Sequence, residues 1–418
     1  MPIRQIALTF TFILALIATA CSPAPAPTAA PTSAPTLAAT KAQPTASPAP
    51  TRPPKGAIKI AVAVPLSGEQ AALGESVKIG AQFAIKQLSK PLIEMGYGVD
   101  LVSFDDKAQP AEGANVAKKI VSDAEIFAVI GPLNSSVAIS ATTIYNDANL
   151  ALISPAASDP KLTQRGAGVV NRVIGRDDQQ GVAAATFVVK ELGAKSVYVV
   201  NDTTAYGKNS ADAFRDAAKK LGAIIAGEES AAEQNNFDAT VAAIKNANPD
   251  AIYFGGIFIQ GGTFLKQLRA KNIKAHFVGP DGLGDVEFPR FAGDAAVGAY
   301  FVSLVAPVNA SETASFAKDL KSELGKDAPL FTAQAYDATA IALAAITRVA
   351  QENKLARPAV TQAIRATKDF KGITGIFSFT HAGEWASARY YLIKVASANQ
   401  DQWNKNTVAK IIELAPPP

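Results

Sequence analysis

A regular alternation of short apolar segments with segments that are apolar at helical spacing constrains the fold most. From Gly56 onward, "AIKIAVAVPLSG" is followed by "AALGESVKIGAQFAIKQLSK", and the same pattern continues through "IFAVIGP" and "LALISP". Strands that alternate with amphipathic helices predict βαβ units, and therefore a parallel sheet with helices on both faces. The alternation restarts near residues 176–181. The sequence therefore predicts an α/β fold with two doubly wound parallel-sheet lobes.

The first 55 residues do not follow this pattern. Residues 1–21 contain Arg4, an apolar run "IALTFTFILALIATA" and the only cysteine, Cys21, which is typical of a secretory signal peptide. The segment "IATAC" resembles a bacterial lipobox, which implies a lipidated Cys21; the alternative is an ordinary signal peptide that happens to contain a cysteine. Residues 22–55 are rich in Pro, Ala and Thr, and we expect a disordered linker there.

Composition argues against several classes of function. The net charge is only +4 and no Lys/Arg run stands out, so nucleic acid is not an expected partner. With one cysteine and two histidines, His276 and His381, a Cys/His metal site lacks ligands, and we expect both histidines to be structural or exposed. The chain has no GxSxG elbow and no histidine in a nucleophile-friendly motif, which argues against a hydrolase. We expect no enzyme activity, no cofactor and no metal.

The segments that follow the predicted strands are candidates for the ligand site, because ligands bind outside the carboxyl ends of strands in open parallel sheets. These segments are small and carry little charge: "GPLNSSVA", "SPAASDPKLT", "NDTTAYGKN", "GGIFIQGG" and "GPDGLGD". The stretch "GIFIQGGT" has P-loop spacing, but Gly262 stands where the lysine is needed, so no nucleotide site is expected. Asp105 and Asp106 form a carboxylate pair, which we interpret as a solvated or hinge-side strand end rather than acid chemistry.

The segments "GPLNSSVA", "ISPAASDPKLTQRG", "AYGKN" and "GPDGLGD" together resemble the Leu/Ile/Val-binding family. These are the type I periplasmic substrate-binding proteins of branched-chain amino acid ABC transporters, and the likeness runs from about Gly56 to the end. The resemblance implies two lobes joined by three crossings, with the ligand shut into the inter-lobe cleft by hinge closure. We expect lobe 1 to comprise 56–176 and 305–387, and lobe 2 to comprise 177–304 and 388–418.

The resemblance also implies specific contacts with the ligand. Ser135 and residues 156–158 match positions that hold the α-carboxylate and the ammonium, and Tyr206 matches the tyrosine of a "YG" pair. Asp281 matches the acidic residue that would pair with the ammonium. A zwitterion in a dry cleft needs such partners, because an unpaired buried charge is costly, and we expect the amides of residues 157 and 158 to donate. The predicted ligand-binding residues are Ser135, Ala156, Ala157, Ser158, Tyr206 and Asp281.

Some lining positions differ from the family pattern and leave the ligand open. Leu73 and Ile257 replace aromatic residues, whereas Phe331 matches an aromatic lining position; Asn134 is a further lining residue. The pocket is therefore expected to be more aliphatic. A branched-chain or related amino acid is the expected ligand, with a short amide, urea or an aromatic acid as the alternative and a sensor role also open. The expected partners are an ABC permease with its ATPase and, through Cys21, a bacterial membrane; the protein itself is expected to be an extracytoplasmic monomer.

Overall fold

The computed structural model describes residues 55–417, apart from 69, 232–235, 308–310 and 327. The predicted signal peptide, the lipidation of Cys21 and the linker as far as residue 54 lie outside the described residues. No helix in the described part of the chain is long and apolar enough to cross a membrane.

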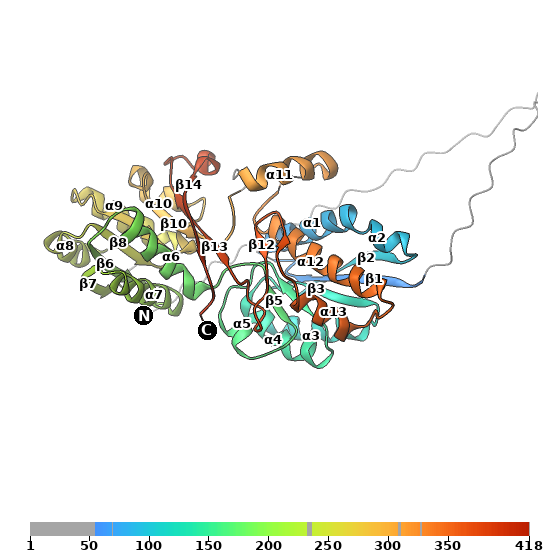
Figure 1. The fold of residues 1–418 in the computed structure, drawn as a ribbon. Coiled ribbons are helices and arrows are strands. Elements are labelled where there is room, and N and C mark those ends of the chain that lie inside the picture. Colours follow the sequence, from blue (N-terminus) through green and yellow to red (C-terminus); the bar gives the residue numbers. More distant parts are fainter. Residues whose placement is uncertain (1–54, 69, 232–235, 308–310, 327, 418) are drawn as a thin grey trace, which may run out of the picture. The chain divides into compact units, whose positions relative to one another are not determined.

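The first sheet consists of five parallel strands in the order β2-β1-β3-β4-β5 (Figure 1). Its strands are β1 (Ala57–Val64), β2 (Gly98–Asp105), β3 (Ile126–Ile130), β4 (Leu152–Ser154) and β5 (Val170–Arg172). Along β1, Ile60 and Val62 join one hydrophobic cluster, whereas Ala61 and Ala63 join another. This alternation of side chains is the reason that helices pack on both faces.

Helices from two distant parts of the chain cover this sheet. One face carries α1 (Ala71–Leu88), α12 (Thr332–Gln351) and α13 (Arg357–Arg365), and the other carries α3 (Pro110–Ser122) and α4 (Ser135–Asp147). The short helices α2 (Lys90–Glu94) and α5 (Lys161–Gln164) complete this part. The long Ala-rich helix α12 therefore packs beside α1, although more than 240 residues separate them.

The second sheet repeats the order of the first and then adds two strands. Its order is β14-β13-β10-β9-β8-β6-β7, and the five strands from β6 to β10 are parallel. Strand β13 runs antiparallel to β10, and β14 runs antiparallel to β13. The bounds are β6 (Ser196–Asn201), β7 (Ile224–Ser230), β8 (Ala251–Gly255), β9 (His276–Gly279), β10 (Tyr300–Ser303), β13 (Ala388–Lys394) and β14 (Thr407–Leu414).

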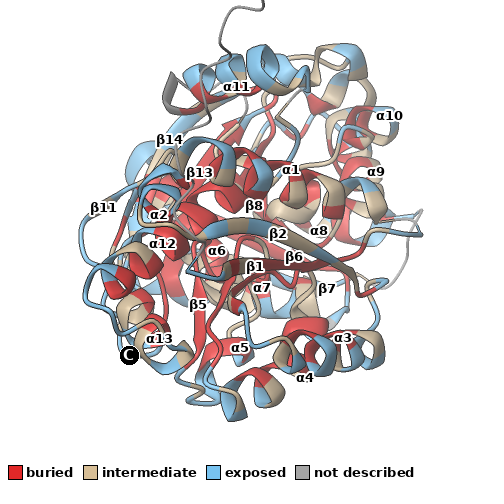
Figure 2. Cartoon of the chain, turned by 90° about the vertical axis from the view of Figure 1, so that its right-hand side faces the viewer, coloured by how far each residue is buried: buried red, intermediate tan, exposed pale blue. Residues whose placement is uncertain are grey.

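Helices also cover both faces of the second sheet. One face packs against α6 (Gln180–Thr186), which continues as a π-helical turn over Phe187–Glu191, and α7 (Ala205–Lys220). The other packs against α8 (Asp238–Ala247) and α9 (Phe258–Ala270). Figure 2 shows buried residues concentrated on the strands, with exposed residues on the outer faces of the helices. The other α-helices and strands of the described chain are α10 (Phe288–Ala292), α11 (Ser311–Leu324), β11 (Phe370–Lys371) and β12 (Ile376–Phe377).

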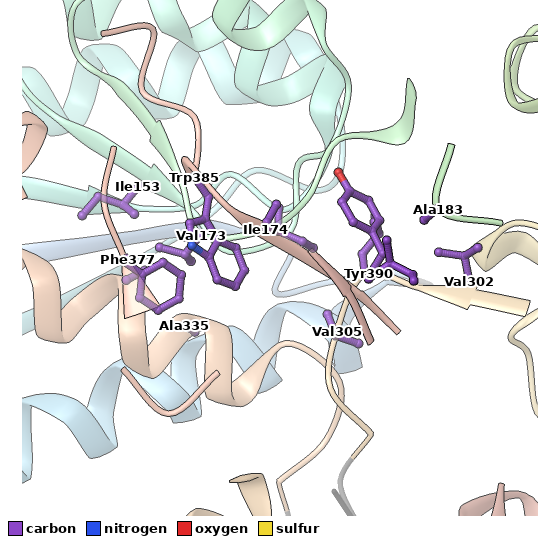
Figure 3. Close-up of a cluster of buried hydrophobic side chains, with 14 of the residues drawn as sticks. Ile153, Val173, Ile174, Ala183, Val302, Val305, Ala335, Phe377, Trp385 and Tyr390 are labelled. Carbon is purple, nitrogen blue, oxygen red and sulfur yellow. The ribbon is translucent and has the colours of Figure 1, made fainter. Parts of the chain in front are cut away.

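Three segments of the described chain connect the two sheets: β5 to α6, β10 to α11, and β12 to β13. Figure 3 shows one buried cluster in which Ile174 of the first crossing and Val305 of the second lie near Tyr390, the third residue of β13, which follows the third crossing. The Tyr390 hydroxyl accepts from the Arg176 amide at 2.8 Å. A Cβ on Gly175 would lie 2.7 Å from the Tyr390 ring, so glycine permits this close approach.

The Asp105–Asp106 pair corrects one expectation. Asp105 lies at the end of β2 and accepts from the amide of Leu66 at 2.8 Å. Asp106, however, is fully buried rather than solvated, and its Oδ1 accepts from the Ala108 amide at 2.9 Å. Burial, with a smaller contribution from Asp105, raises the pKa of Asp106 to about 6. The pair therefore holds the connections that follow β1 and β2. Both histidines are exposed, as expected.

Candidate functional site

The predicted site residues follow strands in both sheets. Ser135 is the first residue of α4, after β3, and residues 156–158 follow β4. In the second sheet, Tyr206 lies in the first turn of α7, after β6, and Asp281 begins a short 3₁₀ turn after β9. All of these positions are at carboxyl ends of parallel strands, where the fold places ligands.

In the first sheet, hydrogen bonds within the chain order the loop after β4. The Ser135 hydroxyl accepts from the Asp159 amide at 3.2 Å, which joins the start of α4 to this loop. The Ala157 amide donates to Ser154 Oγ at 2.8 Å, and Ala157 is only 1% exposed. The Ala157 amide, which we expected to donate to the ligand, donates to Ser154 in this structure. The half-buried Ser158 has an amide with no acceptor among the described residues.

The neighbouring residues complete this side of the site. Ala156 is half-buried, and its amide nitrogen lies 3.4 Å from Ser154 Oγ. Asn134 is the N-cap of α4, but it makes no side-chain capping bond. Its Nδ2 instead donates to Gln70 Oε1 at 2.8 Å. Asn134 therefore connects the loop after β3 to Gln70, the N-cap residue of α1, whose first turn contains Leu73.

In the second sheet, Asp281 is the centre of a compact hydrogen-bond network. Its Oδ1 accepts from the Tyr206 hydroxyl at 2.5 Å and from Gln180 Nε2 at 3.0 Å. The Gly282 amide donates to the Tyr206 oxygen at 2.9 Å. Burial raises the pKa of Asp281. Burial and the adjacent Asp281 carboxylate raise the pKa of Tyr206, so the tyrosine remains protonated and donates.

Asp177, in the first crossing, and Gln180, the first residue of α6, belong to the site although no sequence motif pointed to them. Gln180 Nε2 donates to Asp177 Oδ1 at 3.1 Å as well as to Asp281. The Asp177 amide donates to the Ser158 carbonyl at 3.1 Å. A hydrogen-bonded path therefore runs from the loop after β4, through the crossing, to Asp281. The available signal was the acidic run in "GRDDQQG" at the point where the strand–helix alternation restarts.

The electrostatics of the two carboxylates are unusual. Burial, together with the negative charge of Asp281, raises the pKa of Asp177 to about 6. Hydrogen bonds from Ser158 and Gln180 and the charge of Arg172 act in the opposite direction. Two carboxylates bridged by one neutral amide repel each other, and a cation placed near both would relieve that repulsion. The arrangement can therefore bind an ammonium group.

The three apolar lining residues are half-buried and lie at the starts of helices. Leu73 is in the first turn of α1, and Ile257 and Phe331 are the N-cap residues of α9 and α12. Phe331 has a φ of 69°, which is strained for a bulky side chain. The hydroxyl of Ser76 donates to the carbonyls of Leu73 and Leu330, each at 2.6 Å, so the starts of α1 and α12 are adjacent.

A cavity of about 600 Å³ lies beside the second crossing. Its lining includes Gly284, Val305, Phe331 and Trp403. Of the predicted residues in the described part of the chain, Phe331 alone lines it. The cavity is therefore distinct from the place where the polar residues converge. The described residues contain no group of three or more His, Cys, Asp and Glu that could hold a metal ion.

Most of the chain is similar to known proteins. A family model described as periplasmic binding protein matches residues 57–401. The Leu/Ile/Val-binding protein BraC3 of Rhizobium johnstonii is 34% identical over 81% of this chain and 91% of its own length. The leucine-, isoleucine-, valine-, threonine- and alanine-binding protein of Pseudomonas aeruginosa is 32% identical over 78% of this chain and 87% of its own.

A solved structure is similar over the same region. The branched-chain amino acid transporter substrate binding protein LivJ from Streptococcus pneumoniae, in complex with isoleucine, matches with a TM-score of 0.67 and 26% identity. The match covers 86% of this chain and 99% of that one.

Proposed function

Because the chain belongs to the periplasmic binding protein family, we propose that it captures a branched-chain or related amino acid and delivers it to an ABC importer. Proteins of this family are extracytoplasmic transport components rather than enzymes. The observation that supports an amino acid most directly is the pair of carboxylates, Asp177 and Asp281, bridged by Gln180. A ligand without a positive charge has no use for two half-buried acids.

The proposed binding mode places the two charges of the ligand at opposite ends of the hydrogen-bonded path. The ammonium group lies between Asp281 and Asp177, where charge-assisted hydrogen bonds form. The α-carboxylate accepts from the Ser158 amide and the Ser135 hydroxyl. The half-buried Ala156 lies beside them, whereas Ala157 supports the loop from the core. The aliphatic side chain extends toward the lining residues, which are Leu73, Asn134, Ile257 and Phe331.

We propose that the two sheets form two lobes, 56–176 with 305–387 and 177–304 with 388–418, which close around the ligand by a hinge motion. A lipidated Cys21 would anchor the monomeric protein to a bacterial membrane, with 22–55 as a spacer between the anchor and the folded body. In that position the folded body delivers its ligand to a membrane permease and the ATPase that drives it.

The first test is calorimetric titration of the purified protein after denaturation and refolding, which removes carried-over ligand. The panel contains the L-amino acids, short amides, urea and aromatic acids. We expect one-to-one binding of leucine, isoleucine or valine. We also expect Asp281→Asn to weaken binding by about a hundredfold or more, because it removes one partner of a buried charge pair.

Asp285→Asn is the matched control, because Asp285 lies four positions further along and caps the Glu287 amide at 2.7 Å. It should bind as the unmodified protein does. Binding of an amide or an aromatic acid, with no heat from any amino acid, would replace the amino-acid assignment by the alternative ligand class.

A further inference from the structure

Arg172 is buried directly behind the loop that follows β4. It is the last residue of β5 and is 0% exposed. Its Nη1 donates to the Ala157 carbonyl at 3.1 Å, and its Nη2 donates to the Asp159 carbonyl at 3.1 Å. The Ala157 carbonyl belongs to the peptide group that joins residue 157 to Ser158, and the Asp159 carbonyl belongs to the peptide group that follows Asp159. The guanidinium therefore holds the loop immediately before Ser158 and again one residue after it.

This contact determines where the Ser158 amide points. The peptide unit between Ala157 and Ser158 is planar and trans, so its N–H is directed opposite to its C=O. Because the Ala157 carbonyl faces the guanidinium of Arg172, the Ser158 N–H is directed away from it. That amide has no acceptor among the described residues. It is the donor that the proposed function assigns to the ligand carboxylate.

Glu384, in the third crossing, compensates the charge of Arg172. It is 3% exposed, and its Oε2 lies 2.9 Å from Arg172 Nε. Its Oε1 accepts from the Thr163 hydroxyl and lies 3.5 Å from Nη1 of Arg176, in the first crossing. The Thr163 hydroxyl also accepts from Arg172 Nη2 at 3.0 Å. One buried carboxylate therefore joins helix α5, the end of β5 and two of the crossings.

We propose that Arg172 and Glu384 are positioning residues for ligand binding. They fix the loop after β4 so that the Ser158 amide is already directed at the ligand carboxylate, and they connect this loop to the crossings about which the lobes move. Pre-organisation of this kind raises affinity, because the loop loses little freedom when the ligand binds. The identity of the ligand used in the test rests on the proposed function.

Arg357, a half-buried arginine, provides a matched control. Arg357 donates to the backbone carbonyls of Val121, Asp123 and Ile126, so it is also a clamp on several carbonyls. Its partners lie at the opposite end of the sheet, before β3 and at its first residue, away from the loop after β4. If Arg357 has only a structural role, Arg357→Lys should lower the free energy of unfolding of the protein and leave its affinity for the ligand unchanged.

The experiment compares Arg172→Lys, Thr163→Val and Arg357→Lys in the purified protein. Thr163→Val is nearly isosteric and removes only the hydroxyl between Arg172 and Glu384. It therefore tests the same positioning role if Arg172→Lys fails to fold. The measurements are L-leucine affinity by calorimetry, stability in urea, and amide hydrogen exchange of residues 152–166 without ligand. Lysine cannot reproduce the fork of donors of an arginine.

We expect Arg172→Lys to weaken leucine binding at least about tenfold, which corresponds to about 1.4 kcal/mol. We expect Thr163→Val to weaken it in the same direction by a smaller factor. Exchange in the 152–166 segment should accelerate in both variants, whereas Arg357→Lys should change neither affinity nor exchange there. Equal affinity in Arg172→Lys and Arg357→Lys at similar loss of stability would overturn the proposal.

The exchange measurement separates this inference from the proposed function. If the unmodified protein binds no amino acid, the proposed function fails. Amide hydrogen exchange of residues 152–166 then still measures whether Arg172 and Glu384 hold this loop in place. Faster exchange in Arg172→Lys and Thr163→Val alone would then still support the positioning role. Unchanged exchange in both variants would refute it whatever the ligand is.

Discussion

At the scale of single residues, the chemistry of the site depends on two partly buried carboxylate side chains. Asp281 and Asp177 are both half-buried, and Gln180 donates one hydrogen bond to each. A neutral amide does not compensate two negative charges, so one of the acids has a raised affinity for a proton when no ligand is present. The ammonium of an amino acid can take the place of that proton, which favours amino acids over uncharged amides.

The raised pKa of Asp177 predicts a pH dependence of binding. Its carboxylate gains a proton as the pH falls through about 6, and it then no longer attracts an ammonium. We expect leucine affinity to fall between pH 7 and pH 5 in the unmodified protein. Asp177→Asn should bind more weakly at pH 7 and vary less with pH, as calorimetry at each pH would measure. An unchanged pH profile in Asp177→Asn would exclude Asp177 as the titrating group.

The raised pKa of Asp177 has the opposite effect on the stability of the ligand-free protein. The folded protein binds the Asp177 proton more tightly than the unfolded chain does, because the pKa is raised on folding. The contribution of Asp177 to stability is therefore fully present below the ordinary aspartate pKa and is lost as the pH rises through about 6. Stability and affinity thus depend on this one group with opposite signs, and the two measurements together identify it.

At the scale of elements, the helices that carry lining residues are held by close backbone approach. Gly80 in α1 faces the start of α12, where a Cβ would overlap the carbonyl oxygen of Thr332. Leu73 lies in the first turn of α1, and Phe331 directly precedes α12. The distance between the two helices therefore also sets the spacing of two predicted lining residues.

We expect Gly80→Ala to lower the free energy of unfolding by about 1–3 kcal/mol, because it overpacks this contact. Urea denaturation followed by circular dichroism measures the change. Gly98→Ala is the control, because no described atom lies within 4 Å of a Cβ there, and it should be neutral or slightly stabilising. Equal stability of the two variants would show that α1 and α12 separate without cost.

At the scale of the whole folded part, the three crossings form one buried cluster (Figure 3). Tyr390, in β13 directly after the third crossing, accepts from the amide of Arg176 and donates to the carbonyl of Arg176, which lies in the first crossing. These contacts join the first and third connections between the sheets, and a hinge motion about the crossings is the proposed route to closure.

Small-angle X-ray scattering can measure that closure. We expect saturating L-leucine to reduce the radius of gyration of the purified protein, because closing two lobes makes a binding protein more compact. Asp281→Asn, at a leucine concentration that it does not bind, should show no such change and serves as the control. An unchanged radius in the unmodified protein at saturation would argue against hinge closure.

Much of the fold was predictable, because it depends on local patterns. The alternation of apolar strands and amphipathic helices predicted two parallel sheets with helices on both faces, and the first five strands of each observed sheet are parallel. The resemblance to the Leu/Ile/Val-binding family is confirmed by the family model and the relatives. Strand β14 was not predicted, because its burial pattern is irregular and it pairs with β13 alone.

The sequence by itself determined the strands, the helices and the order of the loops, because hydrophobic periodicity and turn residues act over a few neighbouring positions. The tertiary structure decided which polar atoms remain available. In the folded chain the Ala157 amide donates to Ser154, and Asp106 is buried. Gln180 donates to Asp281, which lies 101 positions further along the sequence. Such contacts depend on how the two sheets and the crossings between them pack. A sequence pattern within one segment cannot predict them, because the two partners lie far apart in the sequence.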